Sequence, residues 1–231
     1  HLVEDPGLGL LTAEAGVGKT AALRNLCDKL PQPDYLTIYL CDTAIAPLDL
    51  YRGLALELGV RPSHRRSQLW ADLKKALLNL VDERGNHPIV VIDEAQHLSD
   101  AFLLDLGGFL NFAFDSRDLF TLWLVGLPPL SRRLRMLQHA ALLTRVATEV
   151  RLEPLDREAF GLALDHGFKS AGATSKVISD QAAEILFRSS RGVLRIASRL
   201  LRASLRIAQE RSQTFLDEAI VQAALDELTP S

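Results

Sequence analysis

The chain has 231 residues, of which 48% are apolar and 24% are charged, and its formal net charge at pH 7 is -3. This composition excludes a disordered, collagen-like or coiled-coil chain, and the length suits one domain or a domain with an appendage. The slightly acidic balance argues weakly against a protein that coats nucleic acid by bulk charge, but it allows local basic patches.

Short apolar runs with strand character alternate with longer stretches of helical spacing up to about residue 152. This alternation predicts a parallel sheet flanked by helices. The predicted strands are Leu8 to Thr12, Leu36 to Cys41, Ile89 to Asp93, Thr121 to Gly126 and Val146 to Leu152. The helices predicted between them are Thr20 to Leu30, Leu48 to Leu58, Gln68 to Asp82, Ala101 to Phe114 and Leu130 to Leu142.

The pattern changes after Pro154, because the rest of the chain has only helical periodicity. We therefore expect an α/β core over residues 1–153 and a small helical domain over residues 154–231. The helices predicted there are Asp156 to Ala171, Ser179 to Arg188, Val193 to Arg211 and Phe215 to Leu228, with Ser179 as a helix N-cap.

A glycine-containing loop follows the first predicted strand. The run A-E-A-G-V-G-K-T, from Ala13 to Thr20, matches the phosphate-loop pattern G-x-x-x-x-G-K-[ST], with Ala13 in the first glycine position. Glycines let backbone N–H groups converge on phosphate oxygens, and the helix N-terminus and the lysine add positive charge. The threonine hydroxyl can bind Mg²⁺. The predicted nucleotide-binding residues are Glu14, Ala15, Gly16, Val17, Gly18, Lys19, Thr20 and Ala21.

Two acids end the third predicted strand, in the run I-V-V-I-D-E-A-Q. A strand buried on both faces has such a continuous apolar run, and ligands of open α/β sheets bind at the carboxyl ends of strands. We predict that Asp93 holds Mg²⁺ with Thr20. We also predict that Glu94 polarises the attacking water while Lys19 acts on the reacting phosphate.

The phosphate loop, the D-E-A-Q box, the five strands and the trailing helices together resemble the AAA+ ATPases. The resemblance implies an AAA+ P-loop fold, in which a five-stranded parallel sheet of order 5-1-4-3-2 is followed by a small all-helical lid domain. It also implies ATP and Mg²⁺ as ligands and ATP hydrolysis as the activity.

The resemblance gives two arginines a role. Arg145 precedes the fifth strand, where a family arginine reaches the γ phosphate held by a neighbouring subunit; the alternative is a surface residue. Arg195 ends the run G-V-L-R, which matches a family G-x-x-R pattern and implies a contact to the phosphates of its own subunit. Arg199, Arg202 and Arg206 continue one basic face of that helix, for which simple solvation is the alternative.

One family feature is not found. Many members place a polar residue at the end of the fourth strand to sense the γ phosphate, whereas that strand here ends in Gly126 and Leu127. Thr121 is polar but lies early in the strand. The sequence therefore assigns no such sensor, which is consistent with slow hydrolysis or with hydrolysis gated by a partner.

The local sequence is similar to one branch of the family. The runs G-L-L-T-A-E-A-G-V-G-K-T, V-I-D-E-A-Q-H-L and L-V-G-L-P-P-L resemble the branch that holds the TnsC and TniB transposition regulators and the ExeA-type ATPases. Resemblance to the regulators implies a homo-oligomer, a ring or a filament, with ATP at its subunit interfaces. Such an oligomer binds double-stranded DNA, marks a target and recruits or stimulates a transposase.

The densest basic loop supplies the candidate DNA contacts, Arg61, Arg65 and Arg66, and Lys74 and Lys75 follow on the next helix. Such residues contact phosphates without reading sequence. A second basic cluster runs from Ser131 to Arg135. Charge runs are more often solvated faces, and neither cluster has the interleaved aromatic residues that favour stacking on single strands.

Three other functions compete with this one. An ExeA-type secretion or envelope-assembly ATPase would act on protein partners, and a nucleotide-switched scaffold would bind ATP with little turnover. A helicase is disfavoured because no second motor domain fits in the chain. Cys27 and Cys41 are too few for a disulfide framework, and no apolar run approaches the roughly 18 residues that span a bilayer. We therefore expect a cytoplasmic protein without a membrane partner.

Overall fold

The computed structural model describes residues 6–31, 34–111 and 118–228. Compactness divides the chain into two units. The first comprises His1–Glu14 and Lys19–Leu152, and the second comprises Ala15–Gly18 and Glu153–Ser231.

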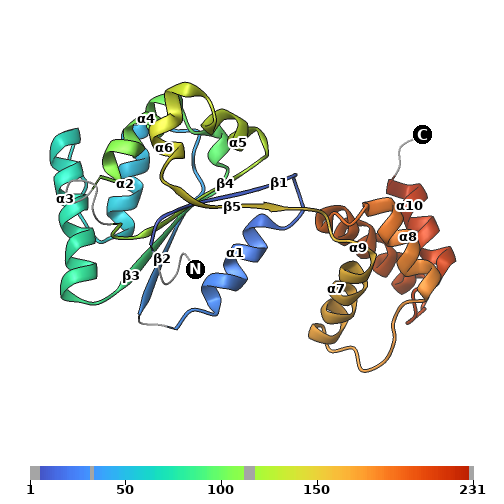
Figure 1. Cartoon of the computed structure of the whole chain (residues 1–231). Helices are drawn as coiled ribbons and strands as arrows, with labels where there is room; N and C mark the ends of the chain where they lie inside the picture. The colour runs from blue at the N-terminus through green and yellow to red at the C-terminus, as the bar shows by residue number, and fades with distance from the viewer. Residues whose placement is uncertain (1–5, 32–33, 112–117, 229–231) are drawn as a thin grey trace. The chain divides into compact units, whose positions relative to one another are not determined.

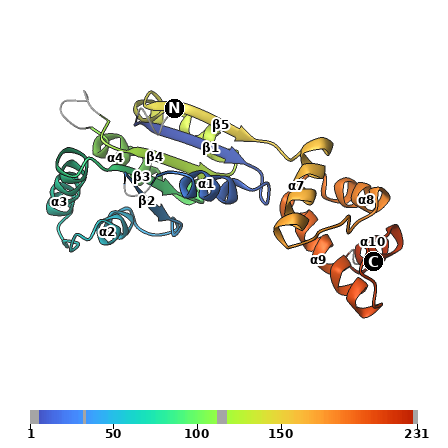
Figure 2. The same cartoon turned by 90° about the horizontal axis from the view of Figure 1, so that it is seen from below.

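A parallel sheet forms the centre of the first unit. Among the described residues it has five strands: β1 (Leu8–Ala13), β2 (Tyr35–Leu40), β3 (His87–Ile92), β4 (Thr121–Gly126) and β5 (Val146–Leu152). Figure 2 shows them side by side in the order β2-β3-β4-β1-β5, which confirms the predicted order 5-1-4-3-2. Because the strands are parallel, their carboxyl ends share one edge of the sheet. The end of β4 therefore lies between the ends of β3 and β1.

The two faces of the sheet carry different helices, as Figure 1 shows. Strand residues alternate between the faces, so Leu10 and Leu124 belong to one apolar cluster while Leu11 and Val125 belong to another. The second cluster includes Leu23 of helix α1 (Lys19–Asp28). Helices that contribute to the first cluster are α2 (Pro47–Glu57), α3 (Arg66–Leu78), α4 (Asp100–Phe109), α5 (Pro129–Leu134) and α6 (Ala140–Leu143).

Several helices of the first unit differ from the prediction. The stretch predicted as one helix from Leu130 to Leu142 forms α5, a 3₁₀ turn (Leu137–His139) and α6. Met136 interrupts it because its backbone is extended, with φ -68° and ψ 145°. Helix α3 ends in a π turn, Asn79–Glu83. Residues 112–114 of the helix predicted up to Phe114 lie outside the described residues.

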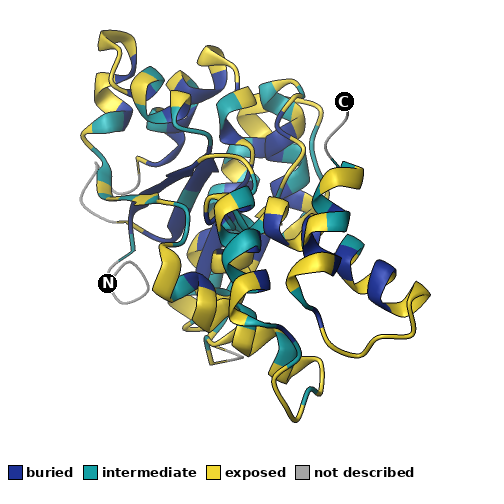
Figure 3. Ribbon diagram, turned by 90° about the vertical axis from the view of Figure 1, so that its right-hand side faces the viewer, coloured by how far each residue is buried: buried dark blue, intermediate teal, exposed yellow. Residues whose placement is uncertain are grey.

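The second unit is helical and has its own apolar core. Its helices are α7 (Arg157–Ser170), α8 (Asp180–Ser190), α9 (Leu194–Glu210) and α10 (Glu218–Leu228). Phe160, Leu186, Leu200 and Ile220 are among the side chains buried between them. Figure 3 shows the resulting alternation of buried and exposed residues along the helices. Burial of such side chains, at roughly 1.5–3 kcal/mol each, stabilises the helices more than their intrinsic propensities do.

The caps explain where two of these helices begin. The Ser179 hydroxyl oxygen accepts the Ala182 N–H at 3.1 Å, so Ser179 is the predicted N-cap of α8. Helix α10 begins three residues after the predicted Phe215. Leu216 instead forms a β-bridge with Ile178, and the Asp217 carboxylate accepts the Ile220 N–H at 2.9 Å.

Candidate nucleotide-binding site

The loop between β1 and α1 has the backbone that the phosphate-loop pattern requires. Gly16 and Gly18 have φ values of +82° and +119°, which L side chains rarely adopt. Ala13, in the first glycine position, is buried as the last residue of β1 and is not among the positive-φ residues. An alanine is therefore compatible with that position.

Lys19 is the first residue of α1 and is 8% exposed. Its Nζ donates to the carbonyl oxygens of Ala13, at 3.0 Å, and Glu14, at 3.3 Å. The ammonium is thus held against the start of the loop by the backbone. Of the other predicted loop residues, Glu14, Ala15 and Ala21 are exposed and Val17 is buried.

Thr20 and Asp93 come together although 73 residues separate them in the chain. The Thr20 hydroxyl donates to Oδ2 of Asp93 at 2.6 Å. Asp93 is 3% exposed and follows β3 directly. A hydroxyl and a carboxylate are oxygen ligands of the kind that Mg²⁺ takes from proteins, with water and phosphate completing its octahedron. The donor set therefore fits Mg²⁺.

Tyr39 joins this pair, although no motif in the sequence singles it out. Its hydroxyl donates to the same Asp93 oxygen at 2.8 Å, and Tyr39 is the second-last residue of β2. Partial burial, together with the hydrogen bond to Asp93 and its negative charge, raises the pKa of Tyr39 to about 12. Only the register of β2 against β3, which aligns Tyr39 with Val91, brings the phenol there.

Glu94 has an unusual backbone and an exposed side chain. Its φ of 52° and ψ of 32° lie in the left-handed region, which non-glycine residues occupy at a cost of order 1 kcal/mol or more. Two hydrogen bonds hold this conformation: the Glu94 N–H donates to Oδ1 of Asp93 at 2.8 Å, and the buried Thr43 hydroxyl donates to the Glu94 carbonyl oxygen at 2.9 Å. The backbone of this turn is therefore fixed on both sides.

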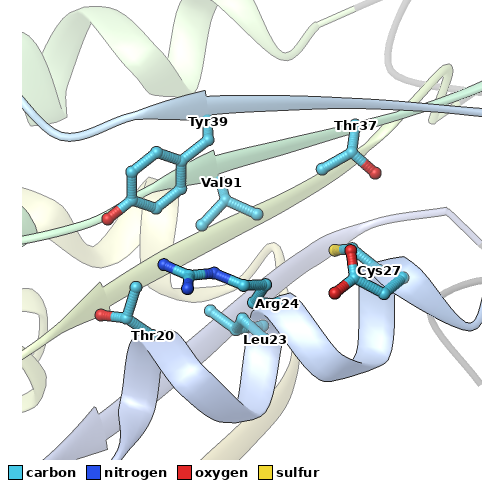
Figure 4. A pocket seen from close by; sticks show the side chains of 8 residues that line it. Thr20, Leu23, Arg24, Cys27, Thr37, Tyr39 and Val91 are labelled. Atoms are coloured by element: carbon cyan, nitrogen blue, oxygen red, sulfur yellow. The ribbon is translucent and has the colours of Figure 1, made fainter.

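A pocket of about 310 Å³ adjoins the Thr20 and Tyr39 side chains. It lies between α1 and the β2–β3 part of the sheet, as Figure 4 shows. Its walls are Thr20, Leu23, Arg24, Cys27, Asp28, Thr37, Tyr39 and Val91.

The two arginines implied by the resemblance lie in different units. Arg145 is half-buried in the turn between α6 and β5, and its N–H donates to the Leu142 carbonyl oxygen at 3.1 Å. Arg195 is exposed in the first turn of α9. Within the second unit, which includes the loop residues Ala15–Gly18, the Arg195 N–H donates to the Gly16 carbonyl oxygen at 3.0 Å.

The predicted DNA-contact residues do not share one environment. Arg66 pairs with Asp105 at 2.8 Å and stacks over the Trp70 ring. Lys74 donates to the Asn111 carbonyl oxygen at 2.7 Å, and burial lowers the pKa of its ammonium. Arg61, Arg65 and Lys75 have exposed side chains. The charges with the greatest freedom to meet a phosphate backbone are therefore those of Arg61, Arg65 and Lys75.

The second basic cluster is tied into the core unit. Arg133 pairs with Asp100 at 2.8 Å, and Arg135 pairs with Glu149 at 2.6 Å. On α9 the basic face is partly paired as well, because Arg206 donates to Glu227 at 2.6 Å and to Glu210 at 3.1 Å.

Among the described residues, no helix is long and apolar enough to cross a membrane.

Comparisons with known proteins agree with this geometry. Residues 3–134 match the family described as AAA domain. General secretion pathway protein A of Aeromonas hydrophila is 27% identical over 208 residues, which are 84% of this chain and 36% of that protein. The match supports the predicted resemblance to ExeA-type ATPases. The chain spans little more than a third of this relative.

Solved structures support the fold. Cdc6p of Pyrobaculum aerophilum superposes with a TM-score of 0.70 at 18% identity, covering 100% of this chain and 64% of that one. Orc1 of Aeropyrum pernix, solved in complex with DNA, gives 0.69 at 19% identity over 97% and 60% of the two chains. The RuvB Holliday junction branch migration motor of Thermotoga maritima gives 0.65 at 18% identity over 96% and 62%. The chain thus spans less than two thirds of each.

Proposed function

The chain belongs to the AAA domain family, and from this premise we propose that it binds ATP with Mg²⁺ and hydrolyses it. One observation carries the proposal: the Thr20 hydroxyl lies 2.6 Å from the Asp93 carboxylate, directly after a loop whose glycines have positive φ. Chance glycine turns do not also bring a buried acid from a distant strand to the first turn of the following helix.

Each residue has a distinct role in this proposal. Backbone N–H groups of residues 14–21 surround the phosphates, and Lys19 neutralises their charge. Thr20 and Asp93 would hold Mg²⁺, which supplies charge neutralisation at the phosphate oxygens. Glu94, on its fixed turn at the end of β3, orients the attacking water and accepts its proton.

We propose further that hydrolysis depends on assembly of a homo-oligomer, a ring or a filament. Residues 1–153 would act as the nucleotide-binding core and residues 154–231 as the lid domain. Arg145 would complete the site of a neighbouring subunit, where an arginine at the γ phosphate is worth roughly 10³ to 10⁵ in rate in other systems. Arg195 would contact the phosphates within its own subunit.

For the biological role, we propose a cytoplasmic regulator of DNA transposition that binds double-stranded DNA when ATP is present and recruits or stimulates a transposase. The support is the resemblance of the sequence around the phosphate loop and the D-E-A-Q box to that of the transposition regulators. Arg61, Arg65 and Lys75 provide exposed positive charge for phosphates, whereas Arg66 and Lys74 also have partners within the chain.

One observation favours a second function. The relative named General secretion pathway protein A matches 84% of this chain. A motor or switch that acts on proteins in secretion is therefore the alternative, and it makes the same predictions for ATP but none for DNA. A scaffold with little turnover is distinguished from both by its hydrolysis rate.

The ATP site is tested with three variants and a mixing experiment. Lys19→Ala should abolish ATP binding, whereas Glu94→Gln should retain ATP and remain assembled without turnover. Arg145→Ala should bind ATP but not hydrolyse it, and mixing it with Lys19→Ala subunits should restore part of the activity. Normal turnover in Glu94→Gln would remove Glu94 from the mechanism, and absence of rescue would remove Arg145 as a residue acting in trans.

The DNA surface is tested by charge removal. The double variant Arg61→Ala and Arg65→Ala should weaken binding to duplex DNA and flatten its salt dependence by about one to two ion equivalents. The matched control removes Lys29 and Arg84, two other exposed charges of the same unit. Equal salt slopes in the two double variants would exclude the Arg61–Arg65 loop from DNA binding.

A further inference from the structure

Gln96 connects the Glu94 side chain to the end of β4. Its Nε2 donates to Oε2 of Glu94 at 2.6 Å, and its Oε1 accepts the Leu127 N–H at 3.0 Å. The amide thus uses one donor and one acceptor at the same time. A glutamate at this position has no hydrogen to offer the Glu94 carboxylate and would repel it.

The sheet leaves room for this amide only because β4 ends in glycine. A Cβ placed on Gly126 would lie 2.6 Å from Oε1 of Gln96 and 3.1 Å from the Leu130 side chain. Real Cβ atoms essentially never come within 3.0 Å of another heavy atom, so any side chain there would displace the Gln96 amide. The space that a side chain would fill at the end of β4 is therefore occupied by the Gln96 amide, which comes from the turn after β3.

The backbone that carries Gln96 is itself held in place. Arg133 of α5 donates to the carbonyl oxygen of Gln96 at 3.0 Å and also to that of Leu98, and its guanidinium pairs with Asp100 at 2.8 Å. Side chains held by such second contacts keep a functional group within a narrow range of orientations. The contacts of Arg133 therefore fix the starting point from which the Gln96 side chain reaches Glu94.

We propose that Gln96 is a positioning residue that sets the direction of the Glu94 carboxylate and couples it to the carboxyl end of β4. This inference rests on the proposed ATPase function, in which Glu94 orients the attacking water. The end of β4 lies between the ends of β1 and β3, so a backbone shift at Leu127 would be passed to Glu94 through the Gln96 amide. Gln96 itself need not touch ATP.

The kinetic test compares Gln96→Ala, Gln96→Glu and Gly126→Ala with a control at Gln68, a glutamine that bonds Asp72 on the exposed face of α3. We expect each of the three variants to lose roughly 10-fold to 100-fold in kcat, because loss of a well-positioned general base costs about 10²-fold to 10⁴-fold. The affinity for a fluorescent ATP analogue should change less than threefold, and Gln68→Ala should match the wild type. An unchanged kcat in Gln96→Ala overturns the proposal, as does a parallel loss of ATP affinity.

The double variant separates positioning from simple support of the fold. If Gln96 acts through Glu94, then adding Gln96→Ala to Glu94→Gln should lower the residual turnover by less than twofold. An additional loss as large as that in the wild type would show that Gln96 acts independently of Glu94, and the proposal would fail.

A measurement without ATP keeps this inference distinct from the proposed function. The shift in urea midpoint caused by Gln96→Ala should be smaller in Glu94→Ala protein than in the wild type, because the pair is already broken there. If the wild type shows no turnover, the proposed function fails, and this comparison alone decides whether Gln96 positions Glu94. Equal midpoint shifts in the two backgrounds overturn the inference whether or not the protein hydrolyses ATP.

Discussion

Gly192 begins the G-V-L-R run that ends at Arg195, and the structure gives a physical reason for the glycine. Its φ is +75°, and a Cβ added to it would lie 1.9 Å from the Leu155 carbonyl oxygen and 2.9 Å from both the carbonyl carbon and the nitrogen of Leu155. The Leu155 N–H donates to the Gly192 carbonyl oxygen at 3.1 Å. We predict that Gly192→Ala strongly destabilises the helical unit.

The magnitude follows from three contributions. An alanine with positive φ costs about 1–2 kcal/mol. Relieving the contact requires a shift of at least 1.1 Å, the difference between the 3.0 Å limit and 1.9 Å, and the opposing atoms are backbone that no rotamer change can move. That shift breaks the Leu155 hydrogen bond, which contributes about 0.5–1.5 kcal/mol. These two energies sum to about 1.5–3.5 kcal/mol, so the variant should lose at least that much unfolding free energy.

Urea unfolding followed by circular dichroism measures this loss. The matched controls are Gly161→Ala and Gly167→Ala on α7, where an added Cβ meets nothing within 4 Å. These two substitutions should stabilise the protein by about 0.5–1 kcal/mol each, because alanine favours the helix interior. A Gly192→Ala protein as stable as the wild type would refute the close contact between Gly192 and the Leu155 backbone.

Three more predictions concern side-chain contacts of the core unit. Thr20→Val should weaken Mg²⁺-dependent ATP binding by about tenfold, or 1.4 kcal/mol, and calorimetry with and without Mg²⁺ should show the loss only when the metal is present. Tyr39→Phe should remove from an absorbance titration a tyrosine that ionises near pH 12 and should change ATP affinity less than threefold; loss of a tyrosine that ionises near the ordinary value of 10.0 would contradict the Asp93 contact. The hydrogen bond from Arg133 lowers the pKa of Asp100 below its ordinary value of 3.8. A lowered pKa stabilises the fold above pH 3.8, so the stability gap between wild type and Asp100→Asn should close as pH falls below that value, and a gap that widens in acid would be inconsistent with this sign.

The sheet and the phosphate loop were predictable because their signals are local. Continuous apolar runs mark strands such as Thr121 to Gly126, whose predicted bounds match β4. Gly16 and Gly18 signal positive φ by residue type alone. The meeting of Thr20 with Asp93 follows from parallel topology, because β1 and β3 end at the same edge of one sheet.

Contacts that depend on register or on side-chain reach were not predictable. Tyr39 approaches Asp93 only through the pairing of β2 with β3, and Gln96 reaches Leu127 only because Gly126 lacks a side chain. The helix predicted from Leu130 to Leu142 breaks at Met136, a residue with no breaking tendency of its own. The clustering of basic residues in the sequence likewise does not reveal that Arg66 pairs with Asp105 or that Lys74 donates to the Asn111 carbonyl oxygen.

We propose that ATP drives assembly of this protein on duplex DNA. Its most direct test is binding to labelled duplex with ATP, ADP or no nucleotide at two salt concentrations, with particle size measured in the same samples and Lys19→Ala as the control. Salt-sensitive DNA binding and particle growth should both require ATP and should be absent in Lys19→Ala. Assembly with ATP but no DNA binding under any condition would contradict the transposition role and favour an ATPase that acts on proteins.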